Sequence, residues 1–153
     1  MRAILHGLRR DRCGAAAMEM VLITPIVAGI IYGAMDFSRA WMMRLQLEQA
    51  AQGGIEAIAA NRSVKTNYSY ALTEATTAYG QPTTSAALDN WLECDGVRQA
   101  NLTANCGNTQ RARYVSIRLA AEFVPAFGWG VFFNGNTANN GFIVVGDAAV
   151  RVQ

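Results

Sequence analysis

The longest apolar stretch of the sequence runs from Gly14 to Met35 and contains one charged residue, Glu19. No other charge appears until Asp36. A helix of about 20 apolar residues is long enough to cross the roughly 30 Å hydrocarbon core of a bilayer. We therefore predict a transmembrane helix over residues 15–36. Its lone acid is the anomaly, because an ionised side chain in lipid costs at least about 2.5 kcal/mol.

Beyond Asp36 the apolar positions recur at helical spacing, which predicts that the helix continues, now amphipathic, over residues 37–60. The positions that form this stripe are Phe37, Trp41, Leu45, Leu47, Ala51, Ile55 and Ile58. Arg44 and Glu48 are spaced for an ion pair on the helix surface. The dipeptide Gly53-Gly54 weakens the pattern and marks a bend or a close backbone contact.

The remainder of the chain predicts a shorter helix over residues 66–79 and then strands near 86–94, 113–123 and 142–152. The middle strand alternates most clearly, and its inward positions are Val115, Ile117, Leu119, Ala121 and Phe123. Residues 126–140, rich in Gly and Asn, are expected to form an exposed loop. The fold class is therefore α+β: a long N-terminal helix packed on a small antiparallel sheet of about three strands. The extramembrane half of the helix covers one face of that sheet.

Four residues bear on how the long helix meets its surroundings. Pro25 is tolerated in a membrane with a local kink or unwinding, because nearby groups take up the freed carbonyl. Gly29 and Gly33 form a small-xxx-small pair that lets another helix approach closely. Trp41, followed by two methionines, is placed for the membrane–water boundary, where an amphipathic ring is favoured.

Charge divides the chain into a basic leader and a nearly neutral body. The chain has 153 residues and a formal net charge of +2. Residues 1–14 hold four Arg and one Asp, and the other residues hold nine basic and ten acidic groups. The basic character thus belongs to the leader, and nucleic-acid binding by the body is not expected. The same arginine excess predicts a cytoplasmic N-terminus and a C-terminal body on the far side of the membrane.

The cysteines divide in the same way. A membrane would leave Cys13 in the reducing cytosol and place Cys94 and Cys106 in an oxidising compartment, where they can pair. A disulfide closing this small loop would stabilise the fold by about 3 kcal/mol; the alternative is two free buried thiols. Because the single histidine, His6, lies in the leader, neither a metal nor a cofactor site is expected in the body. No nucleophile–base pair, carboxylate pair or phosphate loop is recognisable, so we do not expect an enzyme.

A basic segment, then Gly14, then an apolar run with Glu19 near its start, resembles the cleavage and assembly region of type IV prepilins. That resemblance implies cleavage between Gly14 and Ala15 by a prepilin peptidase on the cytoplasmic face of the inner membrane. Glu19 then becomes the fifth residue of the mature chain. An acid one helical turn below a freed amine can be neutralised by the amine of a neighbouring subunit.

The sequence resembles TadE-like pseudopilins more narrowly, through the apolar run and the step formed by Asp36, Phe37 and Arg39 after it. The last two predicted strands also resemble that family's C-terminal strand pair, and many members carry a cysteine pair before those strands. Met20 departs from the family, which often has Phe after the acid. The resemblance implies a minor pseudopilin of a tight-adherence (Tad/Flp) pilus system in a Gram-negative bacterium. It would be a single-pass inner-membrane protein with a periplasmic α+β domain, and its partners would be the peptidase, other pseudopilins, pilus assembly proteins and inner-membrane lipid.

Two other functions compete with this one. In the first, the chain is an unprocessed single-pass inner-membrane protein whose periplasmic domain binds a ligand or scaffolds an envelope complex. Glu19 would then extend toward the cytoplasmic headgroups. In the second, the chain is a periplasmic hydrolase on a tether, for which the sequence offers no motif. The mass of the intact chain separates the first alternative from a processed pseudopilin.

Overall fold

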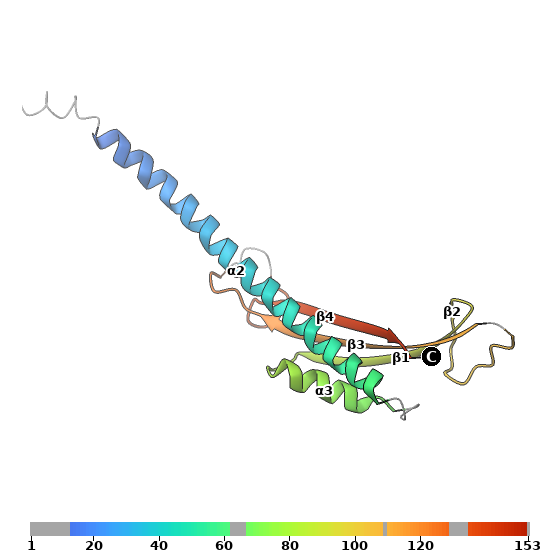
Figure 1. The fold of residues 1–153 in the computed structure, drawn as a ribbon. Coiled ribbons are helices and arrows are strands. Elements are labelled where there is room, and N and C mark those ends of the chain that lie inside the picture. Colours follow the sequence, from blue (N-terminus) through green and yellow to red (C-terminus); the bar gives the residue numbers. More distant parts are fainter. Residues whose placement is uncertain (1–12, 62–66, 109, 129–134, 153) are drawn as a thin grey trace, which may run out of the picture. The chain divides into compact units, whose positions relative to one another are not determined.

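The computed structural model describes residues 13–61, 67–108, 110–128 and 135–152 (Figure 1). Most of the predicted leader, the start of the predicted 66–79 helix and part of the predicted 126–140 loop therefore lie outside the described residues. The chain forms two compact units, residues 1–38 and residues 39–153. We call residues 39–153 the head.

Helix α2 spans Cys13–Ala60, 48 residues, and runs through Pro25. It also includes the Gly53-Gly54 dipeptide, so the helix does not end there. The predicted surface ion pair is present, because Arg44 Nε donates to Glu48 Oε1 at 2.9 Å. Both side chains are partly exposed, and such a pair contributes only a few tenths of a kcal/mol, about 0.3–0.5.

Helix α3 spans Ser69–Tyr79 and is defined by a polar side chain at one end and a glycine at the other. The side-chain oxygen of Asn67 accepts a hydrogen bond from the backbone N–H of Ser69 at 2.9 Å. Gly80 follows the helix with φ 65°, and its N–H donates to the carbonyl of Thr76 at 3.2 Å. A left-handed residue directly after a helix is a common stop signal, and glycine takes it without steric cost.

Four strands form one antiparallel sheet in the order β2-β1-β3-β4. Their bounds are Ser85–Cys94 for β1, Val97–Arg98 for β2, Arg111–Phe123 for β3 and Phe142–Arg151 for β4. The α+β class is confirmed. The sequence pattern does not predict the two-residue strand β2, which pairs with the end of β1.

One face of the sheet is covered by the two helices, which lie side by side over it (Figure 1). The core combines the inward face of β3 with side chains from both helices. Its fully buried members are Leu47, Ala51, Ala71, Ala75, Val115, Ile117, Leu119 and Ala121. The residues of β3 that are predicted to point inward are therefore the ones that contribute to the core.

Two glycines set how closely the elements approach. A Cβ at Gly146 of β4 would lie 2.5 Å from the carbonyl carbon of Leu47, so helix and strand are in backbone contact there. A Cβ at Gly54 would lie 2.6 Å from the carbonyl oxygen of Ala71 and 2.7 Å from Ile117 Cδ1. At Gly54 a close contact, not an interruption of the helix, accounts for the glycine.

Candidate functional site

The first part of α2 has an almost wholly apolar and exposed surface. Its exposed large side chains are Met18, Met20, Val21, Leu22, Ile23, Ile26, Val27, Ile30, Ile31, Tyr32 and Met35. A long apolar helix with its side chains exposed needs an apolar environment, because water around it would be unfavourable by about 25 cal/mol per Å². In length and composition it meets the requirements for crossing a membrane, and almost none of its most apolar window is buried.

Two hydroxyl groups, one in this segment and one just after it, bond to the helix backbone itself. The Thr24 hydroxyl donates to the carbonyl of Met20 at 2.6 Å, and the Ser38 hydroxyl donates to the carbonyl of Ala34 at 2.8 Å. In lipid no water is available for such groups, so bonds of this kind to the preceding turn make the segment compatible with a bilayer.

Gly14 and Glu19 both lie in the first two turns of α2, and both are exposed. A Cβ at Gly14 would meet nothing within 4 Å, so the fold does not require glycine there. The Gly14–Ala15 bond falls in the first helical turn, whose N–H groups have no acceptor within the helix. The bond is therefore at the part of the helix that opens at least cost.

Three residues of the apolar segment, Pro25, Gly29 and Gly33, are expected to mediate helix packing. Pro25 is exposed and Gly29 and Gly33 are half-buried. Gly29 and Gly33, four residues apart, share one side of the helix, and a Cβ at Gly29 would meet nothing within 4 Å. Room for an approaching helix is thus available at Gly29, while the packing role of all three residues stays a prediction.

Residues 36–39 make contacts and have burial that their sequence does not indicate. Asp36 is only 6% exposed, whereas Phe37 is 70% exposed. The guanidinium carbon of Arg39 lies 5.8 Å from the ring centroid of Phe123, the last residue of β3. In the sequence, Asp36 is the first charge after the apolar run, and the pattern carries no signal for its burial.

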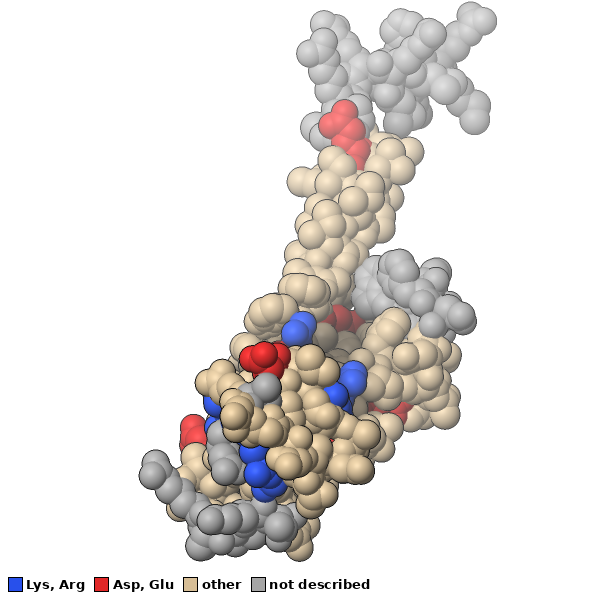
Figure 2. All heavy atoms as spheres, turned by 90° about the vertical axis from the view of Figure 1, so that its right-hand side faces the viewer, with Lys and Arg blue, Asp and Glu red and all other residues tan. Residues whose placement is uncertain are grey.

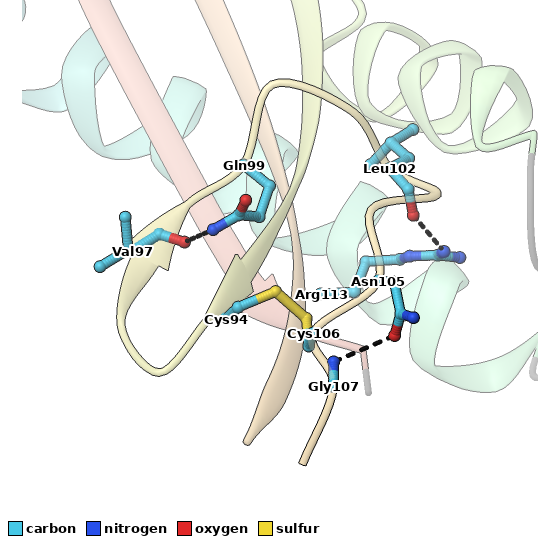
Figure 3. Close-up of a disulfide and its surroundings, with 8 residues drawn as sticks. All are labelled: Cys94, Val97, Gln99, Leu102, Asn105, Cys106, Gly107 and Arg113. Atoms are coloured by element: carbon cyan, nitrogen blue, oxygen red, sulfur yellow. Dashed lines mark hydrogen bonds between the residues drawn. A yellow bond between two sulfur atoms is a disulfide. The ribbon is translucent and has the colours of Figure 1, made fainter. Parts of the chain in front are cut away.

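The opposite end of β3 lies beside a disulfide between Cys94 and Cys106, with 5.3 Å between their Cα atoms (Figure 3). Asp95 and Gly96 follow Cys94 with φ values of 53° and 79°, and they form the tight turn between β1 and β2. Asp-Gly is a strong signal for such a two-residue turn. This dipeptide could have identified the missing strand β2.

Hydrogen bonds hold the loop that the disulfide closes. Arg113 Nη2, on β3, donates to the carbonyl of Leu102 inside the loop at 3.3 Å (Figure 3). The side chain of Asn105 accepts from the N–H of Gly107 at 3.0 Å. The Asp95 N–H also donates to the carbonyl of Gln110 at 2.9 Å. The loop is therefore closed by the disulfide and is also hydrogen-bonded to β3.

The sheet face that points away from the helices carries an aromatic pair beside this loop. The rings of Trp91 and Tyr114 are stacked with centroids 5.4 Å apart, and the guanidinium carbon of Arg98 lies 4.9 Å from the Trp91 centroid. Arg98 also pairs with Asp89 at 2.9 Å, and Trp91 Nε1 donates to Glu93 at 2.7 Å. Figure 2 shows charged side chains gathered over the head and a helix that is uncharged along nearly all its visible length.

The described residues offer no group of three or more His, Cys, Asp or Glu side chains placed to hold a metal ion. In the described part of the chain, two tyrosines of α3 have raised pKa values. Burial raises the pKa of Tyr70, to which neighbouring Tyr68 adds, and burial raises the pKa of Tyr79. The Tyr70 hydroxyl is buried without a hydrogen-bond partner in the described part of the chain.

Residues 14–55 match the family described as TadE-like protein. The match covers Gly14, Glu19, the exposed apolar segment and most of the helix that packs on the sheet. No curated protein and no solved structure matches the chain. The chain therefore carries a TadE-like N-terminal region over residues 14–55, which associates it with Tad pilus systems.

Proposed function

We propose that this protein is a minor pseudopilin of a tight-adherence pilus assembly or secretion system. It would be inserted in the inner membrane with its N-terminus in the cytoplasm and its head in the periplasm. A prepilin peptidase would cut it after Gly14, and its role would be structural, so that it is the substrate of an enzyme and not an enzyme itself. The arginine-rich leader supports this orientation, because basic residues favour the cytoplasmic side.

The observation that carries the proposal is the placement of Gly14 and Glu19 at the start of an exposed apolar helix within the TadE-like match. Cleavage after Gly14 would create an amine on Ala15, four residues before Glu19. Residues four apart on a helix are neighbours, so the two charges come within one turn of each other. In an assembly, the amine of one subunit and Glu19 of the next would form a pair, which removes much of the cost of an acid in lipid.

The test separates recognition by the peptidase from assembly. The Gly14→Val variant leaves the fold unchanged, because Gly14 has open space around it, but the larger side chain hinders approach to the backbone. In cells with an active prepilin peptidase we expect the leader to stay on this variant. The Glu19→Gln variant should lose its leader normally and yet cross-link less to other pseudopilins in the membrane.

The proposal fails if the wild-type chain keeps its leader, as the Gly14→Val variant is expected to do. In that case the competing function gains: an unprocessed single-pass protein whose head scaffolds an envelope complex. The stacked aromatic pair on the open sheet face is the feature of the head that favours such a scaffold. Normal cross-linking of Glu19→Gln would contradict only the assembly role of the acid.

A further inference from the structure

We propose that the end of the head where β3 stops lies in the headgroup layer of the periplasmic leaflet, as a second and peripheral contact with lipid. This inference rests on the proposed membrane insertion of α2. The contact surface consists of Trp41 and Met42 on α2 and of Val124 and Phe127, which follow β3. We call these four residues the apolar rim.

The apolar rim is exposed and comes from two segments that the fold brings together. Trp41, Met42, Val124 and Phe127 are 51%, 57%, 46% and 47% exposed, respectively. The Arg39 guanidinium over the Phe123 ring holds the end of β3 against the start of the head's part of α2. Figure 1 shows the chain beyond β3 at this same end of the sheet.

Exposed apolar side chains are concentrated at this end. Leu45, also exposed, lies one helical turn after Trp41, and exposed Ile143 is the cross-strand partner of Glu122 next to Phe123. Among the large hydrophobic side chains that the described part of the head leaves exposed, only Val97 lies at the disulfide end. The ion pair between Arg98 and Asp89 lies nearer to that end, and Figure 2 shows charged side chains scattered among uncharged ones on the head. A domain that rests on a membrane requires its exposed apolar side chains to be gathered at one end.

The apolar rim contacts lipid in this proposal because its α2 residues lie only a few positions beyond the apolar run along the chain. Trp41 follows Asp36, the first charge after the apolar run, by five residues, which is about 7.5 Å along a helix. The interfacial layer of a bilayer is about 5–7 Å thick on each side. If the apolar run spans the membrane, Trp41 falls at the boundary between the headgroups and water. Arg39 precedes Trp41 and is therefore nearer to the membrane along the chain, and Phe123 is held beside Arg39.

The chemistry of the apolar rim also suits headgroups. Trp, Phe and Met are favoured where an apolar acyl region meets water, and arginine is attracted to anionic lipid phosphates. Arg39 and Arg44 lie at this end, with Arg44 positioned 5.9 Å from the Trp41 ring centroid. The acids there already have partners, because Glu48 binds Arg44 and Glu122 accepts from the amide of Asn139 at 3.2 Å.

Depth-dependent quenching by brominated phospholipid tests the contact on the full chain in vesicles of neutral and anionic lipid. The sequence contains Trp41, Trp91 and Trp129. One protein keeps Trp41 alone and one keeps Trp91 alone, by Trp→Phe changes at the other positions. A third carries Phe127→Trp with all three native tryptophans replaced. Val124→Trp in the same background is a second reporter, in case the first does not fold.

We expect the reporter at position 127 to lose fluorescence to a degree comparable with Trp41, and Trp91, on the outer sheet face at the disulfide end, to be spared. Quenching of Trp41 without quenching at positions 127 and 124 would overturn the second contact and leave membrane insertion standing. Failure to quench Trp41 would contradict the insertion itself. If quenching at position 127 appears only when the protein is diluted in lipid, a second copy covers the apolar rim and the lipid assignment is wrong.

Discussion

At the scale of single residues, small side chains decide how closely the elements of the head pack. Gly54 and Gly146 are positions where a methyl group would collide with backbone atoms of a neighbouring element. Gly53, the neighbour of Gly54, has open space around it. The dipeptide therefore contains one glycine required by packing and one that is not. Its sequence alone left two explanations open, because the face turned toward α3 depends on tertiary contacts.

This difference gives a matched pair of variants. Gly54→Ala should lower the free energy of unfolding of the head by about 1–3 kcal/mol, since α3 or Ile117 must move to accommodate the methyl group. Gly53→Ala should be neutral or should raise it by up to about 1 kcal/mol, because alanine favours a helix more than glycine does. Denaturant titration of the full chain in detergent, followed by circular dichroism, measures both. Equal effects at the two positions would contradict the packing described for Gly54.

Tyr70 provides a second prediction at this scale. Its hydroxyl is buried without a partner in the described structure, and burial, with a smaller effect of Tyr68, raises its pKa. Tyr70→Phe removes the unpaired hydroxyl and should stabilise the head at pH 7 by up to about 1 kcal/mol. Tyr79→Phe should give no such gain, because the Tyr79 hydroxyl is not among the buried groups without a partner in that part of the chain.

The pH dependence of Tyr70 follows from the direction of its shift. Below pH about 10, the ordinary tyrosine pKa, the phenol is neutral in both the folded and unfolded states. Above that value the unfolded chain ionises first, so stability falls as pH rises through the higher pKa of the folded state. In Tyr70→Phe this decline should be shallower. Denaturant titrations between pH 8 and about 11 measure the slope, and an unchanged slope would contradict the raised pKa.

At the scale of elements, the sequence was informative where periodicity is long and regular. The part of the predicted α2 stripe from Leu47 onward and the alternating strand β3 follow from their patterns, because both bury one face against a common core. The first three stripe positions, Phe37, Trp41 and Leu45, are exposed, so the prediction is wrong there. Strand β2 has only two residues, which is too short for a period, and only the Asp95-Gly96 turn announces it. The backbone contact between α2 and β4 at Gly146 could not be predicted, since it depends on which helix residue crosses that strand.

The disulfide loop is the element whose contribution is easiest to isolate. Replacing both Cys94 and Cys106 by Ala should lower the free energy of unfolding by about 2–3 kcal/mol, because the open loop gives the unfolded chain more freedom. The control is Cys13→Ser, outside the head, which should leave unfolding of the head unchanged. Denaturant titration without reductant compares the two. A loss in the control, or no loss in the double variant, would contradict a structural disulfide between these residues.

At the scale of the whole molecule, the two units carry different parts of the proposed function. The unit that contains Gly14 and Glu19 is a helix with an exposed apolar surface, and the head is a compact α+β domain closed by a disulfide. The sequence could indicate the candidate cut site, because that site is a local pattern of residue types. It could not indicate the burial of Asp36 or the apolar rim, because both depend on tertiary structure.

In the proposed function, the chain is cut between Gly14 and Ala15 and its head is oxidised. One measurement tests both parts: the intact mass of the non-reduced chain, extracted from membranes of cells with an active prepilin peptidase after its free thiols have been alkylated under denaturing conditions. Because Cys13 lies before the cut and the other two cysteines are joined, we predict a chain that begins at Ala15 and carries no alkyl label. A chain that begins at Met1 would contradict the cut, and a chain that carries labels on Cys94 and Cys106 would contradict the oxidised head.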